Sequence, residues 1–450
     1  MIHPIQFTLT NHDGTLLFCV IKNTIFAYKT NGEDGHLDLA GEWVDDYDSA
    51  ELIKAKVEKE QQRRLAENAA KKLKTNEGEA IERPGNQRRV PLPGKDPKVP
   101  VPGPGAPPVY QYIRCLQLSH DEKMLVACTD SDKAAVFFRI ELHKDNCLTL
   151  FKRQPFPKRP NAVTFADDDA KLLLADKFGD VYAVDSVGEP EKKDPEPILG
   201  HVSMLTDIAL VTDTKKSYVI TADRDEHIKI SHYPQSFVID KWLFGHKEFV
   251  SSLCVPEWQS SMLFSAGGDS FIATWDWQKG LLMSSFDYST IVEPHLTDAH
   301  LPPARFLAND GSDRREASIS KLLTFKDLPY LVAVPEMTKI VLLLQWDATS
   351  GELILSQTLA LPLNVVSATV TSANHKLILS LDNREQPGKN FVKIFTLENG
   401  KFEEEQAASS SVDEAIVRNL SERPEVQTTV DDIYPLYHVS QLRKRGEHYS

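Results

Sequence analysis

The sequence has few cysteines and no long apolar stretch. Its five cysteines in 450 residues are scattered, with neither a CxxC spacing nor a Cys/His pattern of the kind that binds zinc. No apolar run approaches the roughly 18 residues needed to cross a membrane, and the start Met1–Pro4 lacks the charged segment and apolar run of a signal peptide. We therefore expect a soluble intracellular protein in a reducing compartment, without structural zinc.

Catalytic motifs and excess positive charge are missing as well. The sequence contains no GxSxG elbow, no HExxH motif, no P-loop and no glycine-rich dinucleotide loop after a strand. Its 51 Lys and Arg residues face 65 Asp and Glu residues, a formal net charge of −14, so the chain repels polyanions at long range. These absences argue against an independent enzyme and disfavour a stand-alone RNA-binding protein.

The sequence does contain short runs of Val, Ile, Leu and Phe, separated by Asp, Asn or Gly turns. This pattern is typical of an all-β sandwich or propeller, and repetition at a longer period distinguishes the two. Gly-His pairs end at His201 and His246, which are 45 residues apart (246 − 201 = 45), and Trp275–Asp276 closes the second unit. Because a WD-repeat blade spans about 40 to 45 residues, the spacing predicts two blades of a WD-type propeller.

The repeated polar residues are expected to form a buried hydrogen-bond network that links the strands of one blade. In the second repeat, four residues occupy the positions of this network: His246, Ser265, Asp269 and Trp275. In the first repeat, three residues occupy them: His201, Thr221 and Asp225. Ser231 stands at the tryptophan position there. A structural role for these histidines and aspartates is therefore strongly favoured over a catalytic one.

Weaker units with the same strand pattern lie at about 110–155, 160–199, 316–360 and 362–400, and residues 1–44 supply one more. With the two clear repeats they make about seven blades. We predict an all-β fold, a seven-bladed WD40 β-propeller, with the first blade in 1–44 and the remaining blades in 109–402.

Three segments do not fit the ring. Residues 45–108 are rich in Lys, Glu and Ala and then in Pro and Gly, which predicts a long, largely disordered insertion between blades. Residues 287–315 are expected to be an irregular loop, and residues 403–450 an irregular C-terminal tail outside the core. The basic cluster Lys71–Lys74 suits a nuclear address, although such clusters are more often solvated linker.

Charged residues that a blade does not require gather at turns that should share one rim of the ring. Lys229 follows one such turn on the next strand, where a merely solvated lysine is an equally good interpretation. Nearby Trp242, Phe244 and Phe249 could anchor a partner, but blade packing is favoured for them. We predict a mixed-charge surface for a protein partner, formed by Lys158, Arg159, Lys177, Arg224, Asp225, Glu226 and Lys229.

Several strings in the chain resemble one family, the WD-repeat, non-catalytic subunit of the two-subunit tRNA (guanine-N7)-methyltransferase, in its fungal branch. Generic WD repeats do not share these strings. They are KRPNA at 158–162, ADKFGDVY at 175–182, LGHVSMLTD at 199–207, DRDE at 223–226, GH at 245–246 with FVS at 249–251, and YPLY at 434–437.

This resemblance implies a heterodimer in which a separate subunit holds S-adenosylmethionine and methylates N7 of a guanosine in the tRNA variable loop. The present chain would bind no cofactor and no metal, and would stabilise its partner in the active conformation. The family's subunit-contact turn falls on Arg224, Asp225, Glu226 and Lys229, with Lys177 and Lys158–Arg159 as neighbours. We expect a nuclear protein, with the cytoplasm as a second location.

Two other functions stay open at this stage. One is direct RNA binding, in which Lys158, Arg159, Lys177 and the basic run Arg443–Arg445 contact phosphates. The other is a general WD40 scaffold with several partners.

Overall fold

The computed structural model describes residues 1–31, 36–47, 111–213, 216–307 and 314–445. The chain divides into two compact units, one formed by Met1–Asp45 with Gln111–Ser450 and the other by Asp46–Tyr110. Apart from its first three residues, the predicted insertion 45–108 lies outside the described residues.

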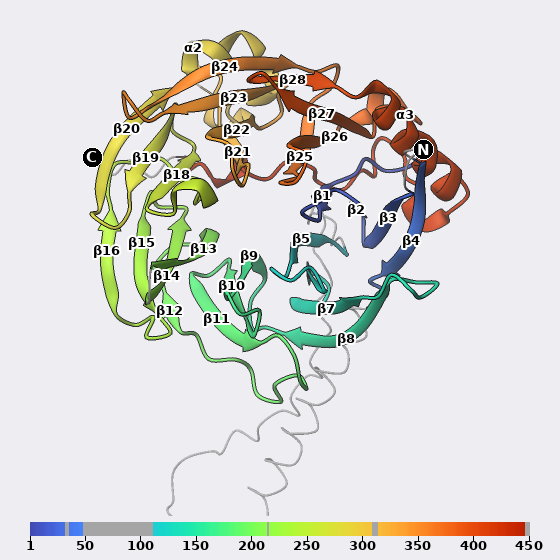
Figure 1. Ribbon diagram of the computed structural model, residues 1–450, viewed down its shortest axis with the longest axis horizontal. Helices are drawn as coiled ribbons and strands as arrows, with labels where there is room; N and C mark the ends of the chain where they lie inside the picture. The colour runs from blue at the N-terminus through green and yellow to red at the C-terminus, as the bar shows by residue number, and fades with distance from the viewer. Residues whose placement is uncertain (32–35, 48–110, 214–215, 308–313, 446–450) are drawn as a thin grey trace, which may run out of the picture. The chain divides into compact units, whose positions relative to one another are not determined.

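The described part of the first unit contains seven four-stranded antiparallel sheets arranged as the blades of a ring (Figure 1). Blade 1 comprises β1 (Phe7–Thr10), β2 (Leu16–Ile21), β3 (Thr24–Asn31) and β4 (His36–Val44). Blade 2 comprises β5 (Ile113–Leu118), β6 (Met124–Thr129), β7 (Ala134–Ile140) and β8 (Leu148–Pro155). Blade 3 comprises β9 (Pro160–Phe165), β10 (Lys171–Asp176), β11 (Asp180–Asp185) and β12 (Leu199–Gly200).

The other four blades follow in chain order. Blade 4 comprises β13 (Leu205–Asp213), β14 (Lys216–Asp223), β15 (Ile228–Tyr233) and β16 (Ile239–Leu243). Blade 5 comprises β17 (Val250–Cys254), β18 (Met262–Gly267), β19 (Phe271–Asp276) and β20 (Leu281–Asp287). Blade 6 comprises β21 (Ile319–Thr324), β22 (Tyr330–Pro335), β23 (Ile340–Asp347) and β24 (Glu352–Ala360). Blade 7 comprises β25 (Val365–Val370), β26 (Lys376–Leu381), β27 (Val392–Glu398) and β28 (Lys401–Glu404).

The predicted seven-bladed fold is therefore confirmed, and each weak unit of the sequence contains one sheet. Strand β28 ends at Glu404, two residues beyond the expected end of the last blade. The connection between β20 and β21, expected to be an irregular loop, holds the short helix α2 (Ser289–Val292) and three 3-10 turns: η3 (Glu293–His295), η4 (Asp298–His300) and η5 (Ala304–Phe306).

The core consists of apolar layers between neighbouring blades. Strand β2, LLFCVI, is buried at every position, as expected for a strand covered on both faces. Each pair of adjacent blades shares one buried apolar cluster, so each blade needs both neighbours to cover its faces. Ring closure follows from this, because a terminal blade would otherwise expose an apolar face.

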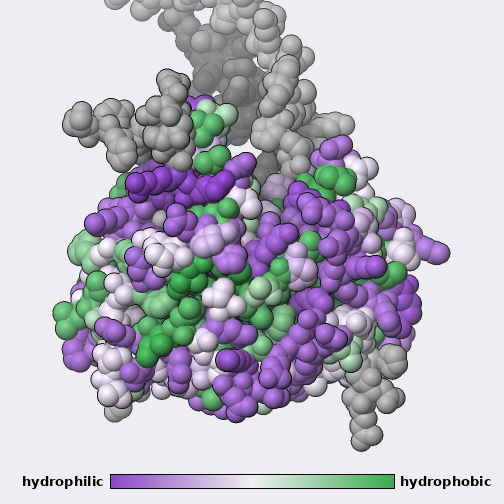
Figure 2. Space-filling model, turned by 90° about the horizontal axis from the view of Figure 1, so that it is seen from above, coloured by the Kyte–Doolittle hydropathy of each residue, from purple (hydrophilic) through white to green (hydrophobic). Residues whose placement is uncertain are grey.

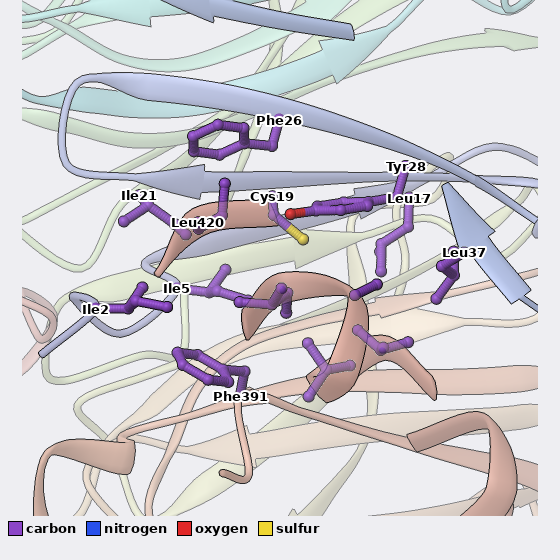
Figure 3. Close-up of a cluster of buried hydrophobic side chains, with 14 of the residues drawn as sticks. Ile2, Ile5, Leu17, Cys19, Ile21, Phe26, Tyr28, Leu37, Phe391 and Leu420 are labelled. Atoms are coloured by element: carbon purple, nitrogen blue, oxygen red, sulfur yellow. The ribbon is translucent and has the colours of Figure 1, made fainter. Parts of the chain in front are cut away.

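The cluster between blades 7 and 1 includes a helix from the C-terminal tail (Figure 3). Helix α3 (Gln406–Leu420) buries Val412, Ala415, Ile416 and Leu420 against blade 1 and Phe391. The expectation that the tail lies outside the core is therefore wrong for this helix. Its apolar residues at i, i+3, i+4 and i+8 form one face, a pattern that the Ser-rich and acidic composition obscured.

Turns between the second and third strands of a blade lie beside the connections that enter it. Three backbone bonds join such pairs: Lys177 N to Arg159 O at 3.0 Å, Arg224 N to Met204 O at 2.9 Å and Gly268 N to Phe249 O at 2.9 Å. We call the side of the ring that carries these turns and connections the connection face.

After α3 the tail crosses the connection face from blade 1 toward β18 (Figure 1). Gln427 forms an isolated bridge with Ile2, Tyr437 Oη donates to Asp382 at 3.0 Å, and Arg443 Nη2 donates to Gly268 O at 2.6 Å. The tail carries the 3-10 turns η7 (Pro424–Val426) and η8 (Ser440–Leu442), while η2 (Glu257–Gln259) and η6 (Asn383–Glu385) belong to blades 5 and 7.

The outermost strands leave apolar side chains in solvent. Leu281, Leu282 and Met283 of β20 and Ile354 of β24 are exposed. Figure 2, seen from the side of β24 and β28, shows apolar surface gathered among hydrophilic surface. In the described residues, no helix is both long enough and apolar enough to span a membrane.

Candidate partner-binding surface

A buried hydrogen-bond network holds the turns of blade 5 in place. His246 Nδ1 lies 2.8 Å from Asp269 Oδ2, and His246 Nε2 lies 2.7 Å from Ser265 Oγ. Trp275 Nε1 donates to the same Ser265 Oγ at 2.8 Å. The four residues join the blade connection, two strands and the turn between those strands, as their positions in the repeat suggest.

The same network in blade 4 uses a different aspartate from the one expected. His201 Nδ1 lies 2.9 Å from Asp223 Oδ2 and His201 Nε2 lies 2.8 Å from Thr221 Oγ1, so Asp225 is not a member. Alternate residues of a strand share a face, which places Asp223 beside Thr221 at the end of β14. In blade 5 the matching strand position is Gly267, so the carboxylate there comes from the turn.

The histidine of this network is neutral at ordinary pH. Burial lowers the pKa of His201 below its usual value, although the hydrogen bond with Asp223 acts in the opposite direction. Asp223 also accepts from the backbone N–H groups of Asp225 at 2.8 Å and His227 at 3.0 Å. The network therefore fixes the shape of the turn that was expected to contact a partner.

Residues Arg224, Asp225 and Glu226 of that turn lie on the connection face, and the C-terminal tail reaches two of them. Arg224 Nε donates to Leu442 O at 2.6 Å. Asp225 accepts from Ser203 Oγ at 2.6 Å and pairs with Lys444 Nζ at 2.7 Å. Glu226 is exposed, with a left-handed backbone φ of 70°. Sequence reasoning did not anticipate the contact with the tail.

Lys229 does not lie on an open surface. It is only 3% exposed, and its Nζ donates to Gly200 O at 2.6 Å and lies 5.5 Å from the ring centre of Trp242. Burial lowers its pKa. The expectation of a surface lysine is wrong for the chain alone, because β15 is the third strand of its blade and the preceding connection covers this position. Lys229 instead lines a pocket of about 320 Å³ together with Asp180 and Phe237.

The basic residues of blade 3 gather around one exposed ring. Lys158 Nζ lies 4.2 Å and Lys177 Nζ 5.8 Å from the ring centre of Phe178, which is 57% exposed. Arg159 lies beside them and approaches Asp130 at 3.5 Å. Burial, followed by repulsion from Arg159, lowers the pKa of Lys177. These cations therefore surround an apolar contact point.

Exposed apolar side chains continue from blade 3 to blade 4. Val202 is fully exposed in the connection beside the 177–179 turn, where a Cβ on Gly179 would meet His201 O at 2.5 Å. Phe244 is 71% exposed and stacks on Trp242 at 6.4 Å. We call Phe178, Val202 and Phe244 the apolar ridge.

Sequence reasoning found only part of this ridge. Blade packing was favoured for Phe244 and Phe249, which holds for Phe249, 2% exposed, but not for Phe244. Val202 was missed, although an apolar residue directly after a Gly-His pair in a polar connection is a usable signal.

The basic run at the end of the tail is already paired. Arg443 contacts Glu248 at 2.9 Å and Glu316 at 3.4 Å, and Arg445 contacts Glu316 at 2.5 Å. These carboxylates neutralise two of the cations that direct RNA binding would use on phosphates, Arg443 and Arg445. Among the described residues there is no group of three or more His, Cys, Asp or Glu side chains placed to hold a metal ion.

Comparison with known proteins identifies the family. A family described as the tRNA methyltransferase TRM82 WD40 domain matches residues 17–197 and 186–394. The chain belongs to the TRM82 family. This confirms the family that the strings of the sequence predicted.

Relatives named tRNA (guanine-N(7)-)-methyltransferase non-catalytic subunit TRM82 match over their full length. The Kluyveromyces lactis protein is 52% identical over 455 residues, the Vanderwaltozyma polyspora protein 46% over 462, and the Saccharomyces cerevisiae S288c protein 45% over 459, with 100% of both chains covered in each case.

Solved structures outside the TRM82 family share the fold. A structure of RRP9 WD40 repeats matches with a TM-score of 0.55 and 13% identity, covering 84% of this chain and 87% of that one. A structure of U3-55K matches with a TM-score of 0.53 and 13% identity, covering 84% of this chain and 88% of that one. At this identity the likeness concerns the propeller alone.

Proposed function

We propose that this chain is the non-catalytic subunit of a tRNA (guanine-N7)-methyltransferase and that it binds the catalytic subunit through the apolar ridge and the turn 223–226. The single observation that carries the binding surface is the exposure of Phe244, at 71%, on a rim held rigid by buried networks. Large exposed apolar side chains rimmed by charge are typical of protein interaction sites.

The catalytic work belongs to the partner in this proposal. The partner holds S-adenosylmethionine and methylates N7 of a guanosine in the tRNA variable loop. The propeller raises activity by binding the competent conformation of the partner better than other conformations. A rigid rim suits that task because little conformational entropy is lost when it binds.

The test is a matched pair of substitutions in the full chain. Phe244→Ala removes the exposed ring of the ridge, and Leu142→Ala removes an apolar side chain that is 47% exposed in a hairpin of blade 2. We expect Phe244→Ala to weaken binding of the purified catalytic subunit at least about tenfold, as for an interface hot spot, and Leu142→Ala to leave it unchanged. Calorimetry measures the affinity. Equal binding by both variants and the original chain would contradict this surface.

A general scaffold makes a different prediction. Such a protein would co-purify with several partners from its own cell, whereas the proposed subunit would co-purify with one stoichiometric methyltransferase. Direct RNA binding would have to rely on Lys158, Arg159 and Lys177, because Arg443 and Arg445 are paired within the chain. It predicts that the isolated propeller retains tRNA with a steep dependence on salt.

We also propose a nuclear location with a cytoplasmic pool, from the basic cluster Lys71–Lys74. Replacing its three lysines by alanine in a fluorescently tagged chain should shift the protein toward the cytoplasm. An unchanged distribution would contradict this assignment.

A further inference from the structure

A second pocket opens on the connection face between the tail and the β20–β21 connection. Its volume is about 450 Å³. The ionisable residues that line it, apart from His300, are four arginines and one glutamate: Arg224, Arg305, Arg443, Arg445 and Glu316. Their sum is +3 (4 − 1), in a chain whose formal net charge is −14. Arg443 and Arg445 are paired with Glu248 and Glu316, so the charges left to attract an anionic ligand are those of Arg224 and Arg305.

The arginines differ in how far they are already engaged. Arg443 already donates hydrogen bonds to Gly268 O and Ala317 O and forms ion pairs with Glu248 and Glu316. Arg224 uses its Nε on Leu442 O. The guanidinium group of the exposed Arg305 lies over the ring of its neighbour Phe306, 4.7 Å from the ring centre. Arg305 is therefore the cation best placed to meet a ligand.

We infer that this pocket binds a carboxylate side chain of the catalytic subunit and extends the partner-binding surface from blade 4 to the connection between blades 5 and 6. The inference rests on the proposed function, because it names a further contact of the same partner. Arg224 belongs both to the turn 223–226 and to the pocket lining, so the two contact areas are continuous.

The surroundings favour a protein carboxylate over an RNA backbone. Glu226, two residues after Arg224 of the lining, is exposed, and its charge would repel a chain of phosphates. Asp298, directly before Ala299 of the lining, is paired with Arg315 at 2.8 Å. Phe306 and Leu307 at its edge are also exposed and suit an apolar neighbour on a protein partner. A guanidinium group binds one carboxylate with two parallel hydrogen bonds, which fits a single acidic side chain between these groups.

The tail is needed to build this pocket, since Ser440, Gln441, Arg443 and Arg445 all come from it. The buried carboxylate of Glu336 holds the tail there. It accepts from three consecutive backbone N–H groups, those of His438 at 2.8 Å, Val439 at 2.7 Å and Ser440 at 2.6 Å. Glu336 lies on blade 6 and is a positioning residue for the pocket.

The test reverses the charge of Arg305 and of a matched arginine. Arg139 is also exposed and also lies over a ring, that of Phe151 at 5.2 Å, but it belongs to blade 2. We expect Arg305→Glu to weaken binding of the purified catalytic subunit about tenfold or more, and Arg139→Glu to change it less than about twofold. An acid-to-arginine change at the contacting residue of the partner should restore binding to Arg305→Glu.

The outcomes separate this inference from the proposed function. If the original chain binds the catalytic subunit and Arg305→Glu binds equally well, the pocket inference is wrong and the proposed function stands. If Arg305→Glu lowers only the affinity of the assembled heterodimer for tRNA, the ligand is RNA and the inference is again wrong. Failure of the original chain to bind would instead overturn the proposed function.

Discussion

Single side chains decide how rigid the connection face is. In blade 4, Asp223 accepts from a histidine ring and from two backbone N–H groups, whereas Asp225, two residues later, contacts Ser203 and the tail. Two aspartates in one turn therefore have separate roles. The first orders the turn from inside, and the second joins it to the tail.

Substitution of these two aspartates should separate their roles. Asp223→Ala leaves a buried histidine and two N–H groups without an acceptor, and we expect it to lower the free energy of unfolding by about 2 to 4 kcal/mol. Asp225→Ala breaks a half-exposed pair and should cost less than about 1 kcal/mol. Urea denaturation measures both. An equal loss of unfolding free energy in the two variants would mean that Asp225 stabilises the turn as strongly as Asp223.

Lys229 supports the apolar ridge from a buried position through a hydrogen bond to the backbone. Its ammonium group holds Gly200 O, and Gly200 is two residues before Val202 of the apolar ridge. We expect Lys229→Met, which keeps the stem but removes the charge, to weaken binding of the catalytic subunit several-fold, with the same dependence on salt as the original chain. A smaller dependence on salt in the variant would show instead that Lys229 pairs directly with an acidic group of the partner.

At the scale of elements, the C-terminal tail is the part that sequence patterns described least well. It begins as a helix in the core, passes the N-terminus, and ends on blades 4 and 5. Two histidines, the buried His3 and the half-buried His438, hold the middle of the tail in place. His3 Nε2 accepts from Tyr434 N at 2.9 Å, and His438 Nε2 lies 3.1 Å from Tyr112 Oη.

These histidines make the tail sensitive to acid. Burial lowers the pKa of both His3 and His438 to about 4, from an ordinary value of 6.5. Between these values the unfolded chain binds more protons than the folded chain, so their contribution to stability is complete above pH 6.5 and is lost as pH falls toward 4. A proton on His3 Nε2 also removes the acceptor of Tyr434 N–H.

We therefore expect the urea concentration at the denaturation midpoint to decrease as the pH is lowered from about 7.5 to about 5. The decrease should be smaller in the double variant His3→Gln, His438→Gln. Glutamine keeps polar groups at both positions but does not titrate. An identical decline in the variant would mean that other groups, such as the buried His201, cause the pH dependence.

At the scale of the whole molecule, closure of the ring depends on the last cluster. Six of the seven apolar clusters, those between consecutive blades from 1 to 7, consist of strands and blade connections, and one of them also includes α2. The seventh cluster, between blades 7 and 1, is completed by α3. Because every blade needs two neighbours, loss of this helix would expose apolar faces on two blades at once.

Ile416 of α3 is fully buried in that cluster. We expect Ile416→Ala to lower the free energy of unfolding by about 2 to 5 kcal/mol, the range for a large apolar side chain removed from a core. Ile354→Ala, at an exposed position of β24, should change it by less than about 0.5 kcal/mol. A small effect at Ile416 would mean that α3 is an appendage and that the ring closes without it.

The blades could be predicted because the pattern that specifies them is local. Gly-His and a Ser or Thr recur at a spacing of about 45 residues, and alternating apolar strands need only their neighbours in the chain to form a sheet. The family strings were equally visible, since each is a short continuous run of the chain around a turn, a blade connection or part of the tail.

Local patterns could not show which connections meet. Arg224 and Leu442 are 218 residues apart in the chain and 2.6 Å apart in the structure. The covering of Lys229 by Gly200, the exposure of Phe244 and the arginine pocket all depend on blades and tail that are brought together by ring closure. The sequence alone thus determined a seven-bladed ring and the buried network of blade 5, but not which aspartate completes the network of blade 4. The tertiary structure decided which of its charged and aromatic side chains remain at the surface, because burial depends on neighbours that are remote in the chain.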